Sequence, residues 1–202
     1  MKKIYVAFTG LLFAFLITGS AMAQTIYIKC TDDRDRVLTS GVSPQAGTIF
    51  DNGKRVDLKD YMEVSSMQFE TEQTLNIGAS GSGAGAGKIS FGDFSFTKNV
   101  DLASTKLLQF QASGSLIKTV EIILQGRSGT VEPVVTYKIL LGMAGVKGFS
   151  ASANGDCGGC VEESYTLQYG TLQIFTYAIA PDGRVTQNPS PFGWDRIKNI
   201  AF

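Results

Sequence analysis

The residues best suited to chemistry in this sequence are three cysteines, because histidine is absent altogether. Without imidazole there can be no Ser-His-Asp or Cys-His catalysis, and no zinc site that uses histidine. The thiols are Cys30, Cys157 and Cys160, and the last two form the motif Cys-Gly-Gly-Cys. An enzyme would have to rely on carboxylate pairs, on Lys or Tyr chemistry, or on a lone thiol, and no spacing here indicates any of these. The sequence therefore predicts no catalytic residues and no cofactor.

The Cys-Gly-Gly-Cys motif leaves four interpretations. A redox pair needs its first thiolate at a helix N-terminus, which lowers the thiol pKa, but residues 161–169 alternate like a strand. A zinc site would need more ligands than Cys30 can supply. We favour a small disulfide between Cys157 and Cys160 in an oxidising compartment, with an unbonded pair, a redox pair or a metal site as alternatives. Cys30 is expected to be a leftover, half-buried thiol.

Two further segments resemble ligand sites without meeting their requirements. Residues 78–87 are rich in Gly, Ser and Ala and precede Lys88. A phosphate-binding loop would need Gly where Ser82 stands and Ser or Thr where Ile89 stands. We interpret this tract as a flexible loop between strands. The acidic run at residues 32–35 lacks the spacing of a calcium loop and is expected to be a solvated turn.

The N-terminus has the three parts of a secretory signal peptide. Lys2 and Lys3 precede an apolar run at residues 4–17, and Ala21-Met22-Ala23 supplies an A-x-A cleavage site. The run is too short to span a bilayer comfortably, which takes about 20 residues. We expect residues 1–23 to be removed between Ala23 and Gln24, and a secreted or periplasmic single domain over residues 24–202.

The charge balance argues against two classes of partner. The sequence holds 18 basic and 18 acidic residues, and loss of the signal peptide leaves a small acidic excess. Nucleic acids and acidic membranes favour basic patches. The sequence predicts no nucleic-acid binding, and no membrane association once the signal peptide is cleaved.

The elements that must position these residues are mostly strands. Apolar residues recur with period two at residues 25–29, at 116–124 (Leu116, Val120, Ile122 and Leu124), and at 131–143 (Val131, Val135, Tyr137, Ile139, Leu141 and Met143). Three other strands change phase midway, across Ser65-Ser66, Gly92-Asp93 and Gly170. A slip reverses the buried face unless a bulge or bend absorbs one residue. Three slips in a small domain predict a closed or strongly curved sheet.

One segment has helical spacing. Asp101 can cap a helix over residues 102–113, with Leu107 and Phe110 facing the sheet and Gly114 as the stop. Residues 31–59 are polar and turn-rich, which predicts a long loop or protruding hairpin that contributes little core. The tail at residues 181–202 is interpreted as an extra terminal strand.

At residues 87–98, Gly-Lys-Ile-Ser-Phe-Gly-Asp-Phe-Ser-Phe-Thr-Lys, the chain resembles the signature of the Hcp family, the ring-forming tube subunits of type VI secretion systems. The resemblance continues through residues 100–104, 106–107, 114 and 117–118, and more weakly through 163–167. Residues 25–29 and 61–69 are similar to the family's early strands. The signal peptide and the length of residues 31–59 depart from the family pattern.

The resemblance implies a mainly β fold: a curved two-sheet β-barrel with one short flanking α-helix. It also implies a hexameric ring that stacks into a tube, a spike protein of the VgrG type as a partner, and secreted effectors. Three functions stay open: a structural tube subunit, an exported Hcp-like binding protein that acts outside a secretion machine, and an enzyme. In a stacked tube we expect residues 31–59 to face the neighbouring ring.

Overall fold

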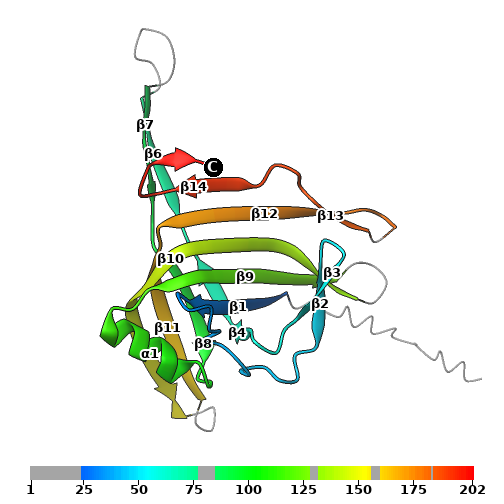
Figure 1. Cartoon of the computed structure of the whole chain (residues 1–202), viewed down its shortest axis with the longest axis vertical. Coiled ribbons are helices and arrows are strands. Elements are labelled where there is room, and N and C mark those ends of the chain that lie inside the picture. The colour runs from blue at the N-terminus through cyan, green and yellow to red at the C-terminus, as the bar shows by residue number, and fades with distance from the viewer. Residues whose placement is uncertain (1–23, 77–84, 128–131, 156–159, 183) are drawn as a thin grey trace, which may run out of the picture.

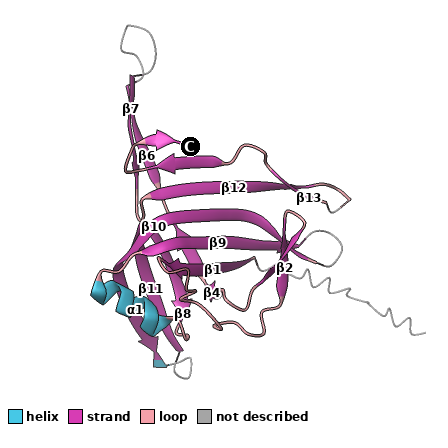
Figure 2. Cartoon of the chain, in the orientation of Figure 1, coloured by secondary structure: helices cyan, strands magenta, loops and turns pink. Residues whose placement is uncertain are grey.

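The computed structural model describes residues 24–76, 85–127, 132–155, 160–182 and 184–202. Within these ranges the chain is built almost entirely of strands, with one helix (Figures 1 and 2). The strands of the first half are β1 (Thr25–Asp32), β2 (Thr48–Asp51), β3 (Lys54–Asp57), β4 (Met62–Val64), β5 (Ser66–Gln68), β6 (Thr71–Asn76), β7 (Gly85–Phe91) and β8 (Phe94–Asn99). The helix α1 (Ser104–Ser113) is followed by β9 (Ile117–Arg127), β10 (Pro133–Asn154), β11 (Cys160–Gln168), β12 (Thr171–Ile179), β13 (Val185–Gln187), β14 (Phe192–Asp195) and β15 (Ile200–Ala201).

Two sheets share the long, bent strand β10. Its first half pairs antiparallel with β9 and β12, and its second half pairs antiparallel with β11. Figure 1 shows β10 curving from the layer of β9 and β12 into the layer of β11 and β8. Met143 lies at the bend with φ 50°, a left-handed conformation that turns the strand. One strand therefore carries the chain around the corner of the barrel.

The opposite corner is made by β4 and β5. Strand β4 pairs with β1 in the first sheet, and β5 pairs with β8 in the second. Between them the Ser65 amide donates to the Thr97 carbonyl (2.8 Å). The predicted curved two-sheet fold is confirmed. The strands do not form one continuous, closed ring of hydrogen bonds; the core is instead enclosed by strands that bend from one sheet into the other.

All three predicted phase slips lie at junctions between strands. Ser65 separates β4 from β5, Gly92-Asp93 separates β7 from β8, and Tyr169-Gly170 separates β11 from β12. At each junction the chain changes its pairing partners. The loss of phase in the sequence therefore marks the places where the chain leaves one sheet for another.

Bulges correct the predicted faces of two strands. A register shift between β1 and β9, beside Lys118, puts Ile117 in the core and leaves Leu116 58% exposed. Met143 is likewise exposed, because it is the bend residue of β10. A shift after Val135 moves that residue to a second apolar cluster, away from Ile139 and Leu141. Val131 lies outside the described residues.

The prediction for residues 31–59 is wrong in one respect, because this segment builds core. Leu38 joins the barrel interior. Ile49 and Leu58 pack with the following Tyr61 over the outer face of the first sheet, against Ile123 and other apolar residues. The hairpin of β2 and β3 turns at Asn52-Gly53, where both residues have positive φ. Shortening this segment would therefore damage folding as well as any assembly.

Helix α1 begins two residues later than predicted and ends as predicted. The Asp101 carboxylate accepts the amide of Ala103 (2.8 Å), but it does not cap the helix itself, whose N-cap residue is Ala103. Gly114 closes the C-terminus with φ 64°. Leu107 is buried and Phe110 packs against the core. The described helix is not long and apolar enough to cross a membrane.

Candidate assembly surface

The hairpin of β6 and β7 projects from the barrel (Figure 1). Its two strands pair with each other, from Thr71 opposite Phe91 to Asn76 opposite Gly85. Residues 85–87 of the predicted glycine-rich loop therefore belong to β7, and the rest of that loop lies outside the described residues. Ile89 lies in strand β7, whereas a helix would follow a phosphate-binding loop. A two-stranded ribbon that leaves the body of the domain is suited to contact another molecule, because among the described strands β6 and β7 pair only with each other.

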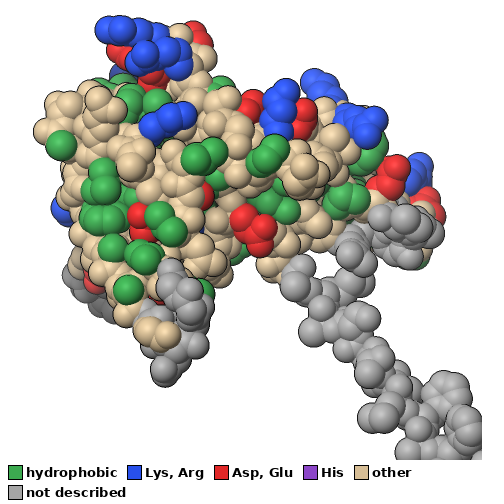
Figure 3. All heavy atoms as spheres, turned by 90° about the horizontal axis from the view of Figure 1, so that it is seen from below, with side chains coloured by type: hydrophobic (Ala, Val, Ile, Leu, Met, Phe, Trp, Pro, Cys, Tyr) green, Lys and Arg blue, Asp and Glu red, His purple; other side chains and the backbone are tan. Residues whose placement is uncertain are grey.

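Exposed apolar side chains concentrate on the C-terminal tail. Large apolar residues of the tail that are 42–70% exposed are Phe192, Ile197, Ile200 and Phe202. Ile197 also lines a groove of about 390 Å³ with Leu116 and Met143 at the bend of β10. Seen from below, by contrast, the molecule shows hydrophobic side chains interspersed among polar ones (Figure 3). Several exposed apolar groups within one short segment of the chain are typical of a contact surface.

A buried polar network lies beneath the N-terminus of α1. The Lys98 ammonium is fully buried and contacts Glu163 (2.9 Å), Asp101 (2.8 Å) and the Ser104 hydroxyl (2.9 Å). Ser104 and Tyr165 both donate hydrogen bonds to Glu163 (2.7 and 3.1 Å). The network joins β8, the start of the helix and β11, so it fixes how the helix sits on the barrel.

The electrostatics of this network are those of a structural ion pair. Burial alone would raise the pKa of Glu163, but hydrogen bonds from Ser104 and Lys98 and the Lys98 charge lower it below its usual value. The pKa of Tyr165 is raised by burial and by the Glu163 carboxylate beside it. Lys98 and Ser104 could form a Ser–Lys pair, but both are buried, so a substrate could reach neither without opening the barrel.

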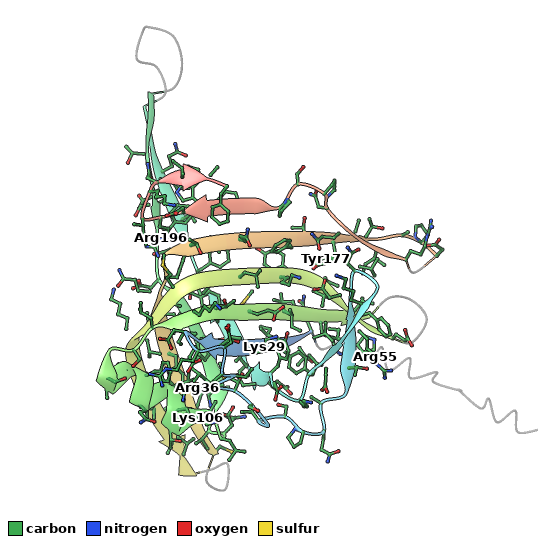
Figure 4. The ribbon with its side chains drawn as sticks, viewed as in Figure 1. Lys29, Arg36, Arg55, Lys106, Tyr177 and Arg196 are labelled. Atoms are coloured by element: carbon green, nitrogen blue, oxygen red, sulfur yellow. The ribbon has the colours of Figure 1, made fainter. Side chains whose placement is uncertain are left out.

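Two polar clusters hold residues 48–61 against the outer face of the first sheet. Tyr61 donates to Glu121 (2.8 Å), which is also paired with Lys29 (2.7 Å). Asp51 pairs with Lys138 (2.5 Å) and accepts a hydrogen bond from Tyr177 (2.6 Å). Lys29 and Tyr177 lie on β1 and β12 of this face in Figure 4. These contacts hold residues 48–61 over the second apolar cluster, which includes Ile49, Leu58 and Ile123.

The acidic run at residues 32–35 is only partly solvated, which corrects the prediction. Asp32 is fully buried and accepts hydrogen bonds from the Arg34 and Arg36 amides (3.0 and 2.8 Å). Burial would raise its pKa, but these bonds and the Arg36 guanidinium lower it. Arg36 and Lys106, labelled in Figure 4, both line a groove of about 840 Å³ between this turn and α1. Among the described residues, no group of His, Cys, Asp or Glu could hold a metal ion.

The structure describes only some of the predicted site residues. Cys30 is fully buried in β1, not half-buried, and burial raises its pKa to about 12. Cys160 begins β11 and is exposed, whereas Cys157 lies outside the described residues. Gln24 is exposed just before β1, and Ala23 lies outside the described residues.

Sequence reasoning missed the chemistry of the buried network, although its signal was present. Lys98, Asp101 and Ser104 all belong to the segments that carry the family resemblance, and Glu163 and Tyr165 belong to the weaker one. Spacing alone could not reveal the network, because Lys98 and Glu163 come together only through the pairing of β8 with β11.

Comparison with solved structures shows the class of fold. A structure described as a type six secretion system protein matches with a TM-score of 0.69 and 18% identity, covering 89% of this chain and all of the other. Hcp1 from Salmonella typhimurium matches with a TM-score of 0.57 and 20% identity, covering 90% of this chain and all of the other. Hcp3 from Pseudomonas aeruginosa, a secreted protein, gives 0.56 and 17%, over 82% and 97% of the two chains. No curated protein matches the sequence.

The sequence also matches a protein family. The family described as type VI secretion system effector, Hcp, matches residues 46–176, which are more than half of the chain. The chain therefore belongs to the Hcp family of type VI secretion proteins. The match ends in β12, so strands β13–β15 and the exposed apolar residues of the tail lie beyond it.

Proposed function

We propose that this chain is a structural, non-catalytic tube subunit that forms closed rings, six copies to a ring, which stack into a tube. The observation that carries the proposal is the family match over residues 46–176 together with the Hcp fold. A head-to-tail contact whose rotation closes produces a ring, and each subunit then needs two different contact surfaces. A VgrG-type spike protein and secreted effectors are the partners that the family resemblance implies.

We assign one of those surfaces to the apolar side chains of the tail, with a second copy of the chain as the occupant. Ile197→Asp would place a charge in that contact, where burial without a partner is costly. Ile197 is 70% exposed, so the change should leave the free subunit folded. Leu102→Asp is the matched control, since Leu102 is 69% exposed and lies outside the tail, two residues before α1.

Light scattering and negative-stain imaging of the mature chain at micromolar concentration test the assembly. We expect rings for the natural chain and for Leu102→Asp, and folded monomers for Ile197→Asp. Equal assembly of both variants would remove the tail from the contact. A strictly monomeric natural chain over a wide concentration range would instead favour an exported binding protein, the function that the signal-peptide pattern supports.

The projecting hairpin is the element that we assign to the contact between stacked rings, in place of residues 31–59. Those residues contribute buried side chains and are tied to the sheet by Asp51. The hairpin of β6 and β7 instead leaves the barrel and exposes Thr71, Glu72 and Thr74. Exposed residues beyond the buried base of the hairpin can be used for contact at little cost in folding.

Export and processing form a separate part of the proposal. We propose cleavage between Ala23 and Gln24, which yields a single domain over residues 24–202 outside the cytoplasm. The intact mass of the exported protein should correspond to a chain that begins at Gln24, and retention of residues 1–23 would contradict cleavage.

We also propose a local disulfide between Cys157 and Cys160 without catalytic use. Replacing both with Ser should leave assembly unchanged, because closing so small a loop adds little stability.

A further inference from the structure

The base of the projecting hairpin is held by the C-terminal tail. Strand β7 ends at Phe91, and Gly92-Asp93 connects it to β8 in the barrel. The Phe91 side chain is buried, and its ring packs against Trp194 of β14 with centroids 6.0 Å apart. Figure 1 shows β14 and β15 crossing the base of the hairpin. The tail therefore covers the joint at which the hairpin leaves the barrel.

Arg196 makes the polar contacts at this joint. Its guanidinium donates to the Phe91 carbonyl (2.7 Å) and to the Tyr169 carbonyl (2.9 Å), while its amide donates to Gly170 (2.9 Å). The guanidinium also lies 4.3 Å from the centre of the Tyr169 ring and 5.8 Å from that of Phe91. Figure 4 places Arg196 where the tail, the hairpin and the bend of β10 meet. One side chain thus joins the end of β7 to the junction between β11 and β12.

We propose that Arg196 is a positioning residue, which ties the tail to the end of β7 and so fixes the direction in which the β6–β7 hairpin leaves the barrel. A planar guanidinium suits this role, because it can donate to two carbonyls from one rigid group. The partly exposed Lys147–Asp93 ion pair (2.7 Å) is a further charged contact near the joint, and water weakens it. The consequence for stacking depends on the proposed function, but the effect on the hairpin does not.

Two aromatic residues at the joint carry buried polar groups. The Tyr169 hydroxyl and the Trp194 indole nitrogen are buried, and neither has a hydrogen-bond partner among the described residues. Unsatisfied buried groups cost free energy and are uncommon in folded proteins. The Trp194 ring packs against Phe91, and the Tyr169 ring lies beside the Arg196 guanidinium. The contacts of Arg196 and Phe91 therefore have to offset this cost.

Distances between spin labels on the hairpin and on the barrel test the assignment directly. Labels at Thr74→Cys on β6, away from the joint, and Thr105→Cys on α1 occupy exposed positions, in a background where Cys157 and Cys160 are Ser. Labelled mature chain is diluted with unlabelled chain so that distances within one subunit dominate. We compare the natural tail, Arg196→Gln and Arg196→Lys with Arg184→Gln, a tail variant whose arginine pairs with nearby Asp182.

We expect a narrow distance distribution for the natural tail and for Arg184→Gln. Arg196→Gln should raise the population of other hairpin orientations about tenfold, which corresponds to about 1.4 kcal/mol. Arg196→Lys should be intermediate, since an ammonium lacks the planar fork. A distribution as narrow in Arg196→Gln as in the natural chain would overturn the assignment. If Arg196→Gln does not fold, Arg196→Lys decides by the same criterion.

Imaging of stacked rings separates this inference from the proposed function. If Arg196→Gln broadens the label-distance distribution and also shortens the stacks, both the role of Arg196 and the proposed contact between rings are supported. A broader distance distribution with stacks of natural length would leave the role of Arg196 intact and remove the hairpin from the contact between rings. If no variant and no natural chain forms rings, the assembly proposal fails while the label distances still decide the role of Arg196.

Discussion

The buried network of Lys98, Glu163 and Tyr165 and the outer cluster of Lys29, Glu121 and Tyr61 use the same chemical groups in two different surroundings. Each combines a lysine, a glutamate and a tyrosine hydroxyl, with ammonium–carboxylate distances of 2.9 Å and 2.7 Å. The Lys98 and Glu163 side chains are 0% and 5% exposed, whereas Lys29 and Glu121 are 28% and 21% exposed. The difference between the two clusters is therefore burial rather than distance.

That difference determines what each cluster does when it is disturbed. In a dry site, removing one partner leaves a charge that neither water nor protein compensates. In a partly exposed site, water solvates the charge that is left and so reduces the loss of stability. The buried network should therefore make the placement of α1 all-or-none, while the outer cluster should only adjust how tightly residues 48–61 are held.

The largest effect is expected from Lys98→Met. The substitution leaves the buried Glu163 carboxylate without its cation, which should cost about 3–5 kcal/mol in the free energy of unfolding. Urea denaturation followed by circular dichroism measures the loss. The double variant with Glu163→Gln removes both charges and should recover much of it. A Lys98→Met chain as stable as the natural one would show that water reaches the network.

Acid should affect the buried network next. The pKa of Glu163 is lowered in the folded state, so Glu163 contributes stability above its unfolded pKa. That contribution is lost as the pH falls through the lower, folded pKa. Urea midpoints should therefore fall as the pH drops below about 4.5, the ordinary value of this carboxyl. Glu163→Gln should flatten part of this fall, and an unchanged acid profile in that variant would contradict the assignment.

The buried network also shows how far the sequence could lead. Period-two strands, the three phase slips, the end of the helix at Gly114 and the family were all accessible from local patterns. The pairing of Lys98 with Glu163 was not, because it depends on register between strands far apart in sequence. The expectation that residues 31–59 contribute little core was wrong for a related reason. Their few apolar residues, such as Ile49 and Leu58, are diluted by polar ones and bury themselves only because a sheet face lies beneath them.

A smaller effect is expected from Lys29→Met in the outer cluster. Glu121 would keep its hydrogen bond from Tyr61 and its access to water. We expect a loss of about 1 kcal/mol, the upper end for partly exposed pairs. Urea denaturation under the conditions used for Lys98→Met gives the direct comparison. A loss as large as that of Lys98→Met would show that burial does not separate the two clusters.

The smallest effect is expected from Lys118→Met, although its ion pair is as close as any in this comparison. Lys118 lies 2.6 Å from Asp35, but the two side chains are 53% and 73% exposed. Water screens the attraction, and ordering two long side chains at the surface costs entropy. We expect a change below about 0.5 kcal/mol, which added salt should reduce further. Denaturation at low and high ionic strength measures it. A salt-independent loss of more than 1 kcal/mol would mean that Lys118 acts through the bulge beside it in β9 rather than through its charge.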